Sequence, residues 1–108
     1  MIESISPAEL IQKLQTAPTS RPLLLDVREP AEFTFCRIRD SLNIPLSEIP
    51  RRIDELDQDR FTVVVCHHGR RSLQAAVFLE QNGFSNVFNL TGGIEAWAND
   101  IEPDMPRY

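Results

Sequence analysis

Short apolar runs alternate along the chain with segments whose apolar residues recur at helical spacing. Residues 23–27 and 62–65 are apolar runs that predict buried strands. Residues 86–90 predict another strand, and residues 43–46 predict a further extended segment. Helices are predicted from residue 7 onward, at 29–33, at 47–56, at 72–81 and at 92–97. Strands that alternate with helices indicate an α/β fold, a central parallel sheet of about five strands with helices on both faces.

Capping residues mark the ends of several predicted helices. Ser6 stands where an N-cap is expected, directly before a proline and three residues before a glutamate. Ala17-Pro18 is expected to end this first helix, and Asn82-Gly83 to end the longest one. Beyond the last helix, the prolines and acidic residues of the segment 99–108 predict a wrap over the surface.

The composition is that of an ordinary soluble domain. With 108 residues, 42% of them hydrophobic, we expect one domain over residues 1–108. No apolar run approaches the roughly 20 residues that span a bilayer, and the first ten residues lack the regions of a signal peptide. We therefore expect the mature chain to begin at or near Met1 and to stay in the cytoplasm. The net charge of −5 argues against nucleic acids or anionic membranes as partners.

The segment from Cys66 to Ser72 carries the candidate chemistry. Cys66 ends an apolar run, and a predicted helix begins at Ser72, so loop N–H groups and the helix N-terminus can converge on the sulfur. That arrangement stabilises a thiolate. Gly69 allows a tight turn, and the pair Arg70-Arg71 attracts a small anion. A cysteine at a strand end is more often an inert hydrophobe, but the whole loop favours a reactive nucleophile.

Four segments, in the order in which they follow one another along the chain, resemble those of the rhodanese-like sulfurtransferases. The Cys66 loop looks like the family's active-site loop. Residues 25–33 (LDVREPAEF) are similar to its Asp-Val-Arg-Glu box, residues 42–46 (LNIPL) to its Asn-Ile-Pro-Leu segment, and residues 89–97 (NLTGGIEAW) to its Gly-Gly-Trp signature. The resemblance covers nearly the whole chain.

Two further details refine the resemblance. The Cys-His-His-Gly loop and the Pro-Arg-Tyr ending look like the rhodanese domains that are fused to sulfur-carrier adenylating enzymes. The segment 36–41 departs from the family pattern, since Cys-Arg-Ile-Arg-Asp-Ser stands where many members have Gly-His-Ile-Pro-Gly-Ala.

The resemblance implies an activity and the residues that carry it. Sulfane sulfur would pass from thiosulfate or a persulfide donor to cyanide, a thiol or a protein, through a persulfide on Cys66, by double displacement without a metal or organic cofactor. The partners would be a small anionic sulfur donor and a thiol or protein acceptor. Asp26 and Arg28 would support the site. The substrate-binding loop would consist of His67, His68, Gly69, Arg70, Arg71 and Ser72.

Three other functions are weighed against this one. A persulfide relay with a protein acceptor stays open. A non-catalytic interaction module on the same fold is less favoured, because inactive relatives usually lose the cysteine that this chain keeps. Related phosphatases place five residues between cysteine and arginine. Here four residues, 67–70, separate Cys66 from Arg71, and the shorter loop favours sulfur transfer.

Several residues keep two interpretations. Adjacent side chains such as His67 and His68 usually point apart, so we expect no shared metal; they fill the loop, orient substrate or move a proton. Cys36 is a packed small residue or a resolving thiol that could form a disulfide with Cys66. Arg28 hydrogen-bonds near the loop or binds substrate. We expect Trp97 to pack in the core with its indole N–H bonded locally.

Overall fold

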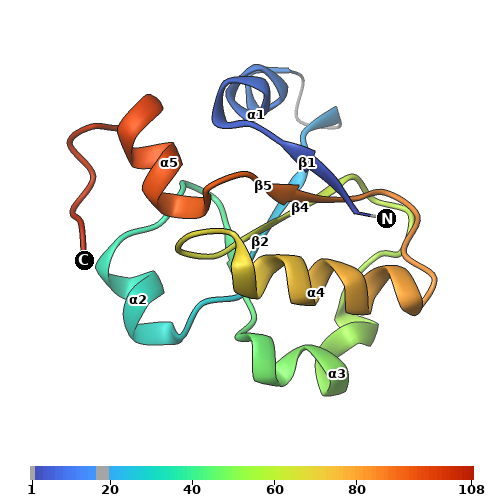
Figure 1. Ribbon diagram of the computed structural model, residues 1–108. Coiled ribbons are helices and arrows are strands. Elements are labelled where there is room, and N and C mark those ends of the chain that lie inside the picture. Colours follow the sequence, from blue (N-terminus) through green and yellow to red (C-terminus); the bar gives the residue numbers. More distant parts are fainter. Residues whose placement is uncertain (1, 17–19) are drawn as a thin grey trace.

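Five parallel strands form one sheet in the order β1-β5-β4-β2-β3 (Figure 1). The structure is a computed structural model that describes residues 2–16 and 20–108. The strands are β1 (Glu3–Ile5), β2 (Leu23–Asp26), β3 (Leu42–Asn43), β4 (Thr62–Val65) and β5 (Val87–Leu90). The helices are α1 (Pro7–Leu14), α2 (Pro30–Phe35), α3 (Ile49–Arg52), α4 (Arg70–Gln81) and α5 (Gly93–Asp100). Short 3-10 turns, η2 (Leu46–Glu48) and η3 (Ile53–Glu55), flank α3.

Both faces of the sheet are covered by helices, as predicted. Successive side chains of a strand point to opposite faces, so β4 contributes to two cores. Val63 and Val65 belong to the core that α1 and α5 cover, whereas Val64 and Cys66 belong to the core that α4 and α3 cover. Because neither face of β4 meets water, its sequence is continuously apolar rather than alternating.

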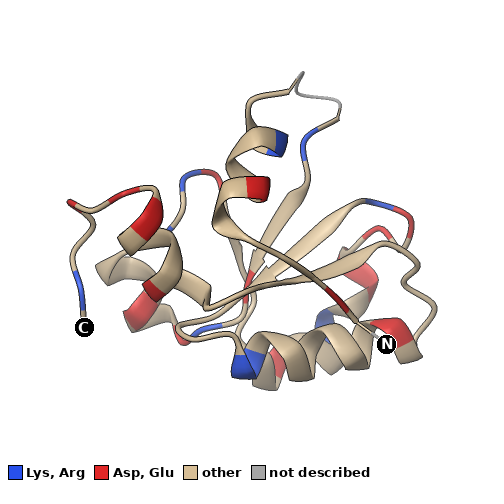
Figure 2. Ribbon diagram, turned by 45° about the horizontal axis from the view of Figure 1, so that its top comes forward, with Lys and Arg blue, Asp and Glu red and all other residues tan. Residues whose placement is uncertain are grey.

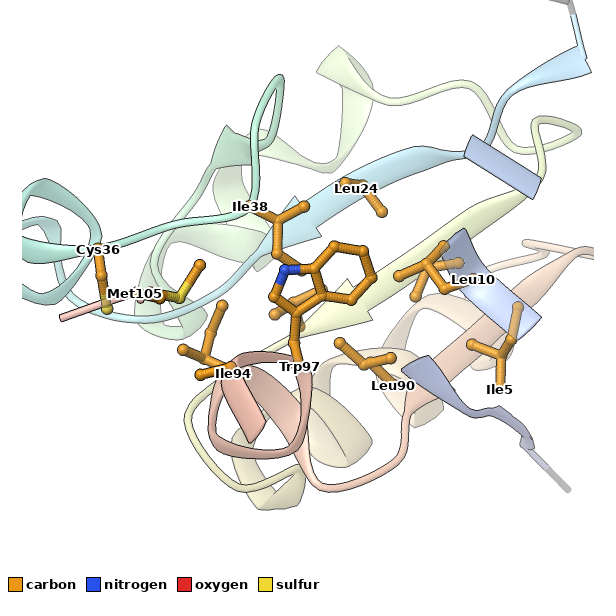
Figure 3. Packing of buried hydrophobic residues seen from close by; sticks show 12 residues of the cluster. Ile5, Leu10, Leu24, Cys36, Ile38, Leu90, Ile94, Trp97 and Met105 are labelled. Carbon is orange, nitrogen blue, oxygen red and sulfur yellow. The ribbon is translucent and has the colours of Figure 1, made fainter. Parts of the chain in front are cut away.

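Trp97 lies at the centre of the core beneath α1 and α5. Figure 3 shows its indole ring among Leu10, Leu24 and Leu90. The residue is 2% exposed, and its indole Nε1–H donates to Glu102 Oε2 at 2.6 Å. The prediction of a packed tryptophan with a locally bonded N–H is therefore confirmed.

The cap residues that were predicted from sequence are present where the structure describes them. The Ser6 hydroxyl accepts from the N–H of Glu9, and the Glu9 carboxylate accepts from the N–H of Ser6, which makes a capping box. Helix α1 ends at Leu14, and the end predicted at Ala17-Pro18 lies outside the described residues. None of the described helices has the length and apolar character needed to cross a membrane.

Several element boundaries differ from the prediction. Strand β1 was not anticipated, because three residues of which only Ile5 is buried carry no readable pattern. The helix predicted over 47–56 is instead α3 with a 3-10 turn on each side, and Pro50 stands within α3. Helix α5 runs to Asp100, so the tail begins later than expected, and the burial of Met105 ties that tail to the core.

The loops that leave β2 and β4 diverge at one edge of the sheet. The chain passes from β2 through α2 to β3 on one side, and from β4 through α4 to β5 on the other. In parallel α/β sheets, such a point of divergence at the carboxyl ends of two neighbouring strands forms a ligand-binding crevice. Cys66 directly follows β4, and Arg28 follows β2 at the same edge.

Candidate active site

Cys66 lies buried at the carboxyl end of β4, held by two donors. The residue is 1% exposed. The backbone N–H of Gly69 donates to its Sγ at 3.0 Å, and the hydroxyl of Ser72 lies 3.3 Å from the same sulfur. Both donors stabilise negative charge on sulfur. The position at a strand end followed at once by a helix is the one predicted from sequence.

The active-site loop is shorter, and the helix after it longer, than the sequence suggested. Helix α4 begins at Arg70 rather than Ser72, because Gly69 adopts a φ of 100° at the N-cap and turns the chain directly into the helix. The prediction that Arg70 and Arg71 belong to the loop is therefore wrong. They occupy the first turn of α4, whose amino end is blue in Figure 2. Arg70 is exposed, and Arg71 is partly buried.

Asn89 in β5 binds both residues that hold the Cys66 sulfur. Its Nδ2 donates to the carbonyl of Gly69 at 3.1 Å, and its Oδ1 accepts a short hydrogen bond from the hydroxyl of Ser72. Asn89 is 8% exposed, so both bonds are shielded from water. The single hydroxyl proton of Ser72 has two acceptors within reach, Asn89 Oδ1 and Cys66 Sγ. Asn89 thus fixes the loop and α4 relative to each other around the sulfur.

The first turn of α5 is hydrogen-bonded to the backbone of the Cys66 loop. The N–H groups of Ile94 and Glu95 donate to the carbonyls of Cys66 and His67 at 2.8 and 3.1 Å. These N–H groups lack partners within their own helix, so the loop satisfies them. Gly93 permits the approach, because a Cβ there would overlap both carbonyl oxygens, and its φ is 61°. The close contact explains why a glycine must stand at this point of the chain.

Asp26 and Arg28 form a fully buried ion pair at the end of β2. The Arg28 guanidinium donates to Asp26 Oδ2 at 2.7 Å, and both side chains are 0% exposed. Arg28 also donates to the carbonyl of Cys36 at 2.7 Å and to the Tyr108 hydroxyl at 3.0 Å. These bonds join the end of β2, the end of α2 and the C-terminal segment. The geometry fits the framework role expected for the pair.

A second ion pair, Glu32 with Arg71, crosses from α2 to α4. Arg71 Nη1 and Nη2 donate to the two carboxylate oxygens of Glu32 at 2.7 and 2.9 Å. The Tyr108 hydroxyl donates to Glu32 Oε2 at 2.9 Å. The hydrogen bonds that Arg71 donates are the main reason that the pKa of Glu32 falls to about 2, and the same bonds raise the pKa of Arg71. The partner of Arg71 is therefore a carboxylate of this chain.

The two histidines do not point apart as expected. The rings of His67 and His68 stack at a centroid distance of 4.0 Å, and the Tyr108 ring stacks on His67 at 4.1 Å. Burial, with the neighbouring His68, lowers the pKa of His67 below its ordinary value, although Glu95 at 3.5 Å opposes this shift. The shift favours the neutral form of His67 near pH 7. Among residues 2–16 and 20–108, no three His, Cys, Asp or Glu side chains are grouped so that they could hold a metal ion.

Cys36 packs in the core beside Arg28. It is 6% exposed, and Arg28 Nη1 lies 3.8 Å from its Sγ. Both cysteines are free thiols. The segment after Cys36 keeps a left-handed turn without glycine, because Asp40 adopts a φ of 65° where the family pattern has Gly. Asp is one of the few residues that tolerate this conformation.

Four residues near the site were not singled out from the sequence. Glu32 and Asn89 lay within the family-like segments, and a polar residue inside the apolar strand β5 was a signal for Asn89. Glu95 precedes Trp97 in the last such segment. Tyr108 lay in the family-like Pro-Arg-Tyr ending, but nothing local predicted its contacts with Glu32 and His67, which join distant parts of the chain.

Comparisons with known proteins agree with the geometry. The rhodanese-like domain family matches residues 6–100. A sulfurtransferase of Allochromatium vinosum is 44% identical over 98 residues, which cover 91% of this chain and 90% of that protein. An adenylyltransferase and sulfurtransferase of Zea mays is 37% identical over 80% of this chain, which spans only 19% of that longer protein. The resemblance to domains fused behind adenylating enzymes is thereby confirmed.

Solved structures give the same result for the fold. A rhodanese-related protein from Thermoplasma volcanium superposes with a TM-score of 0.80 at 38% identity, covering 96% of this chain and 95% of that one. A parallel five-stranded sheet, a cysteine loop at its carboxyl edge and the match over most of the chain all agree. The chain belongs to the rhodanese-like domain family, with sulfurtransferases among its relatives.

Proposed function

We propose that this protein transfers sulfane sulfur through a persulfide on Cys66. The observation that carries the proposal is the N–H of Gly69 that donates to the buried sulfur, with the hydroxyl of Ser72, whose proton Asn89 shares, within reach of the same sulfur. They offset negative charge on a thiolate before attack and on a terminal persulfide sulfur after it. The shielded position of the sulfur favours a stored persulfide over one that is lost to solvent thiols.

The reaction is a double displacement. The Cys66 thiolate attacks the outer sulfur of a donor such as thiosulfate, a new S–S bond forms, and sulfite leaves with the electron pair of the bond that breaks. An acceptor nucleophile, such as cyanide or a thiolate, then attacks the terminal sulfur of the persulfide. The Cys66 thiolate leaves and is ready for another turn. No oxidant or reductant is consumed in either half.

Intact mass after incubation with thiosulfate or a low-molecular-weight persulfide tests the proposal. We expect a gain of one sulfur atom on the wild-type protein and on Cys36→Ser, and none on Cys66→Ser. Sulfur that loads equally on Cys66→Ser would contradict the proposal. Transfer to cyanide would then separate an enzyme for small acceptors from a relay, which loads sulfur but yields no thiocyanate.

Phosphatase chemistry is the alternative that the same assay series addresses. Because one residue fewer separates Cys66 from Arg71 than in the related phosphatases, fewer amides can surround a phosphoryl group. We expect no hydrolysis of p-nitrophenyl phosphate above background. Turnover of this ester that disappears in Cys66→Ser would overturn the assignment to sulfur transfer.

A further inference from the structure

The Arg71 guanidinium, which the sequence suggests as a binding group for an anionic donor, is hydrogen-bonded to Glu32. Its Oε1 accepts from Arg71 Nη1 at 2.7 Å and from the N–H of Glu29 at 2.9 Å. Its Oε2 accepts from Arg71 Nη2 and from the Tyr108 hydroxyl, both at 2.9 Å. Four donors from three segments therefore hold one carboxylate in place. A side chain so fully bonded is a fixed part of the site rather than a mobile surface charge.

The charge of this carboxylate is permanent under assay conditions. The pKa of Glu32 is about 2, so the group is ionised throughout the range in which sulfur transfer can be measured. The positive charge of Arg71 is offset at contact distance, just as that of Arg28 is offset by Asp26. Two of the three guanidinium groups near Cys66, those of Arg28 and Arg71, are thus offset, while Arg70 is exposed, on a protein whose net charge is −5.

We propose that Glu32 makes the Cys66 site select sulfur donors by their charge, discriminating against dianions such as thiosulfate in favour of donors that carry less negative charge. The inference rests on the proposed function and deepens it. A dianion feels twice the repulsion that a monoanion feels from the same carboxylate at the same distance. Two donors that differ in charge but deliver the same sulfur therefore report on Glu32 directly.

Thiosulfate and methanethiosulfonate form such a pair. The first is a dianion and the second a monoanion, in which a methyl group replaces one oxygen. With either donor the Cys66 thiolate forms a bond to the sulfane sulfur, and sulfite or methanesulfinate leaves with the electron pair. The quantity to measure is the ratio of kcat/KM for thiosulfate to kcat/KM for methanethiosulfonate, with cyanide as the acceptor.

In Glu32→Gln this ratio rises by about three- to tenfold over that of the wild type, as expected for one nearby charge at a partly solvated site. The matched control is Glu55→Gln. Glu55 also accepts two hydrogen bonds from one guanidinium, that of Arg52, both at 3.0 Å, but it lies on η3 and contacts none of the site residues named above. Its substitution leaves the ratio within about twofold of the wild type. An unchanged ratio in a folded Glu32→Gln protein overturns the inference.

If Glu32→Gln does not fold, the salt dependence of kcat/KM for thiosulfate in the wild-type protein tests the inference instead. Raising the salt concentration from about 20 to about 200 mM shortens the range of electrostatic attraction and repulsion. With the charge of Arg71 offset, kcat/KM for thiosulfate stays level or rises. A fall of more than about threefold would reveal a site that attracts dianions and would overturn the inference. If neither donor places sulfur on Cys66, the proposed function itself fails, which is a different result from an unchanged ratio.

Discussion

Removal of the Asn89 side chain tests whether β5 positions the sulfur site. In Asn89→Ala, the carbonyl of Gly69 and the hydroxyl of Ser72 each lose a buried partner. Each loss costs about 1–1.5 kcal/mol, so we expect about 2–3 kcal/mol of destabilisation. A domain of this size is stable by about 5–15 kcal/mol and stays folded, with a Tm lower by about 10–15 °C.

The same substitution has a larger relative effect on chemistry. Gly69 and Ser72 both contact Cys66 Sγ, and a hydrogen bond to a charged group contributes about 1.5–3 kcal/mol. Loss of the Asn89 anchor on the Gly69 carbonyl weakens the Gly69 bond to the sulfur, which lowers sulfur transfer by about tenfold or more. The rate of Cys66 alkylation by iodoacetamide at about pH 7, read by mass spectrometry, should fall in parallel. Asn89→Leu, which has a similar shape, separates the loss of these hydrogen bonds from the effect of a cavity.

Asn43→Ala is the matched control for Asn89→Ala. The Asn43 amide also donates to two backbone carbonyls, those of Asp26 at 3.0 Å and Arg28 at 2.9 Å, but it does not contact the loop that holds the sulfur. We expect a comparable loss of Tm with less than about a twofold change in transfer. If folded Asn89→Ala and Asn43→Ala proteins have the same transfer rate, Asn89 is only a structural residue and the reasoning is refuted.

Three further predictions follow from contacts around the loop. Glu32, with its pKa lowered to about 2, stabilises the fold fully above about pH 4.5 and loses that contribution as the pH falls toward 2. Because the Arg71 side chain is 36% exposed, we expect a contribution of about 1–2 kcal/mol. In urea unfolding, the difference in unfolding free energy between wild type and Glu32→Gln should shrink between about pH 6 and pH 3. Gly93→Ala should lose at least about 2 kcal/mol, and Gly83→Ala, where a Cβ would meet only the flexible end of a glutamine side chain, should lose less in the same thermal melt. Arg71→Lys should lower kcat/KM for sulfur transfer by more than about tenfold, or about 1.4 kcal/mol, because lysine cannot bind both Glu32 oxygens in one plane. Unchanged kinetics would show that the pair of Arg71 and Glu32 has no role in sulfur transfer.

The parts of the fold that the sequence predicts are those with a repeating local pattern. Strand β4 is a run of four buried β-branched residues, three of them valine, and α4 carries apolar residues at helical spacing, so both are readable. Strand β1 exists because β5 offers it a partner edge, with Ile5 opposite Leu90, and nothing within its three residues reveals that pairing. The start of α4 depends on the left-handed Gly69, whose φ the sequence does not specify.

The site follows the same division. Cys66, Gly69 and Ser72 lie within one short segment, so their convergence on the sulfur is predictable from the strand–loop–helix order. Arg71 was expected to attract a small anion, but its partner is Glu32, 39 positions away. Pairings of that kind come from the way α2 and α4 approach at the sheet edge. They become visible only when the tertiary structure is known.

The pairing of β1 with β5 has a consequence for how the protein reaches its active form. Residue 3 lies opposite residue 88, so the first strand has no partner until almost the whole domain has been synthesised. The α5 N–H groups that fasten the Cys66 loop come later still in the chain. Such distant contacts slow folding relative to a domain held together by local contacts. During that interval the thiol of Cys66 stands unprotected on an open chain, so the rate of final closure sets how long the nucleophile is exposed to oxidation before it can work.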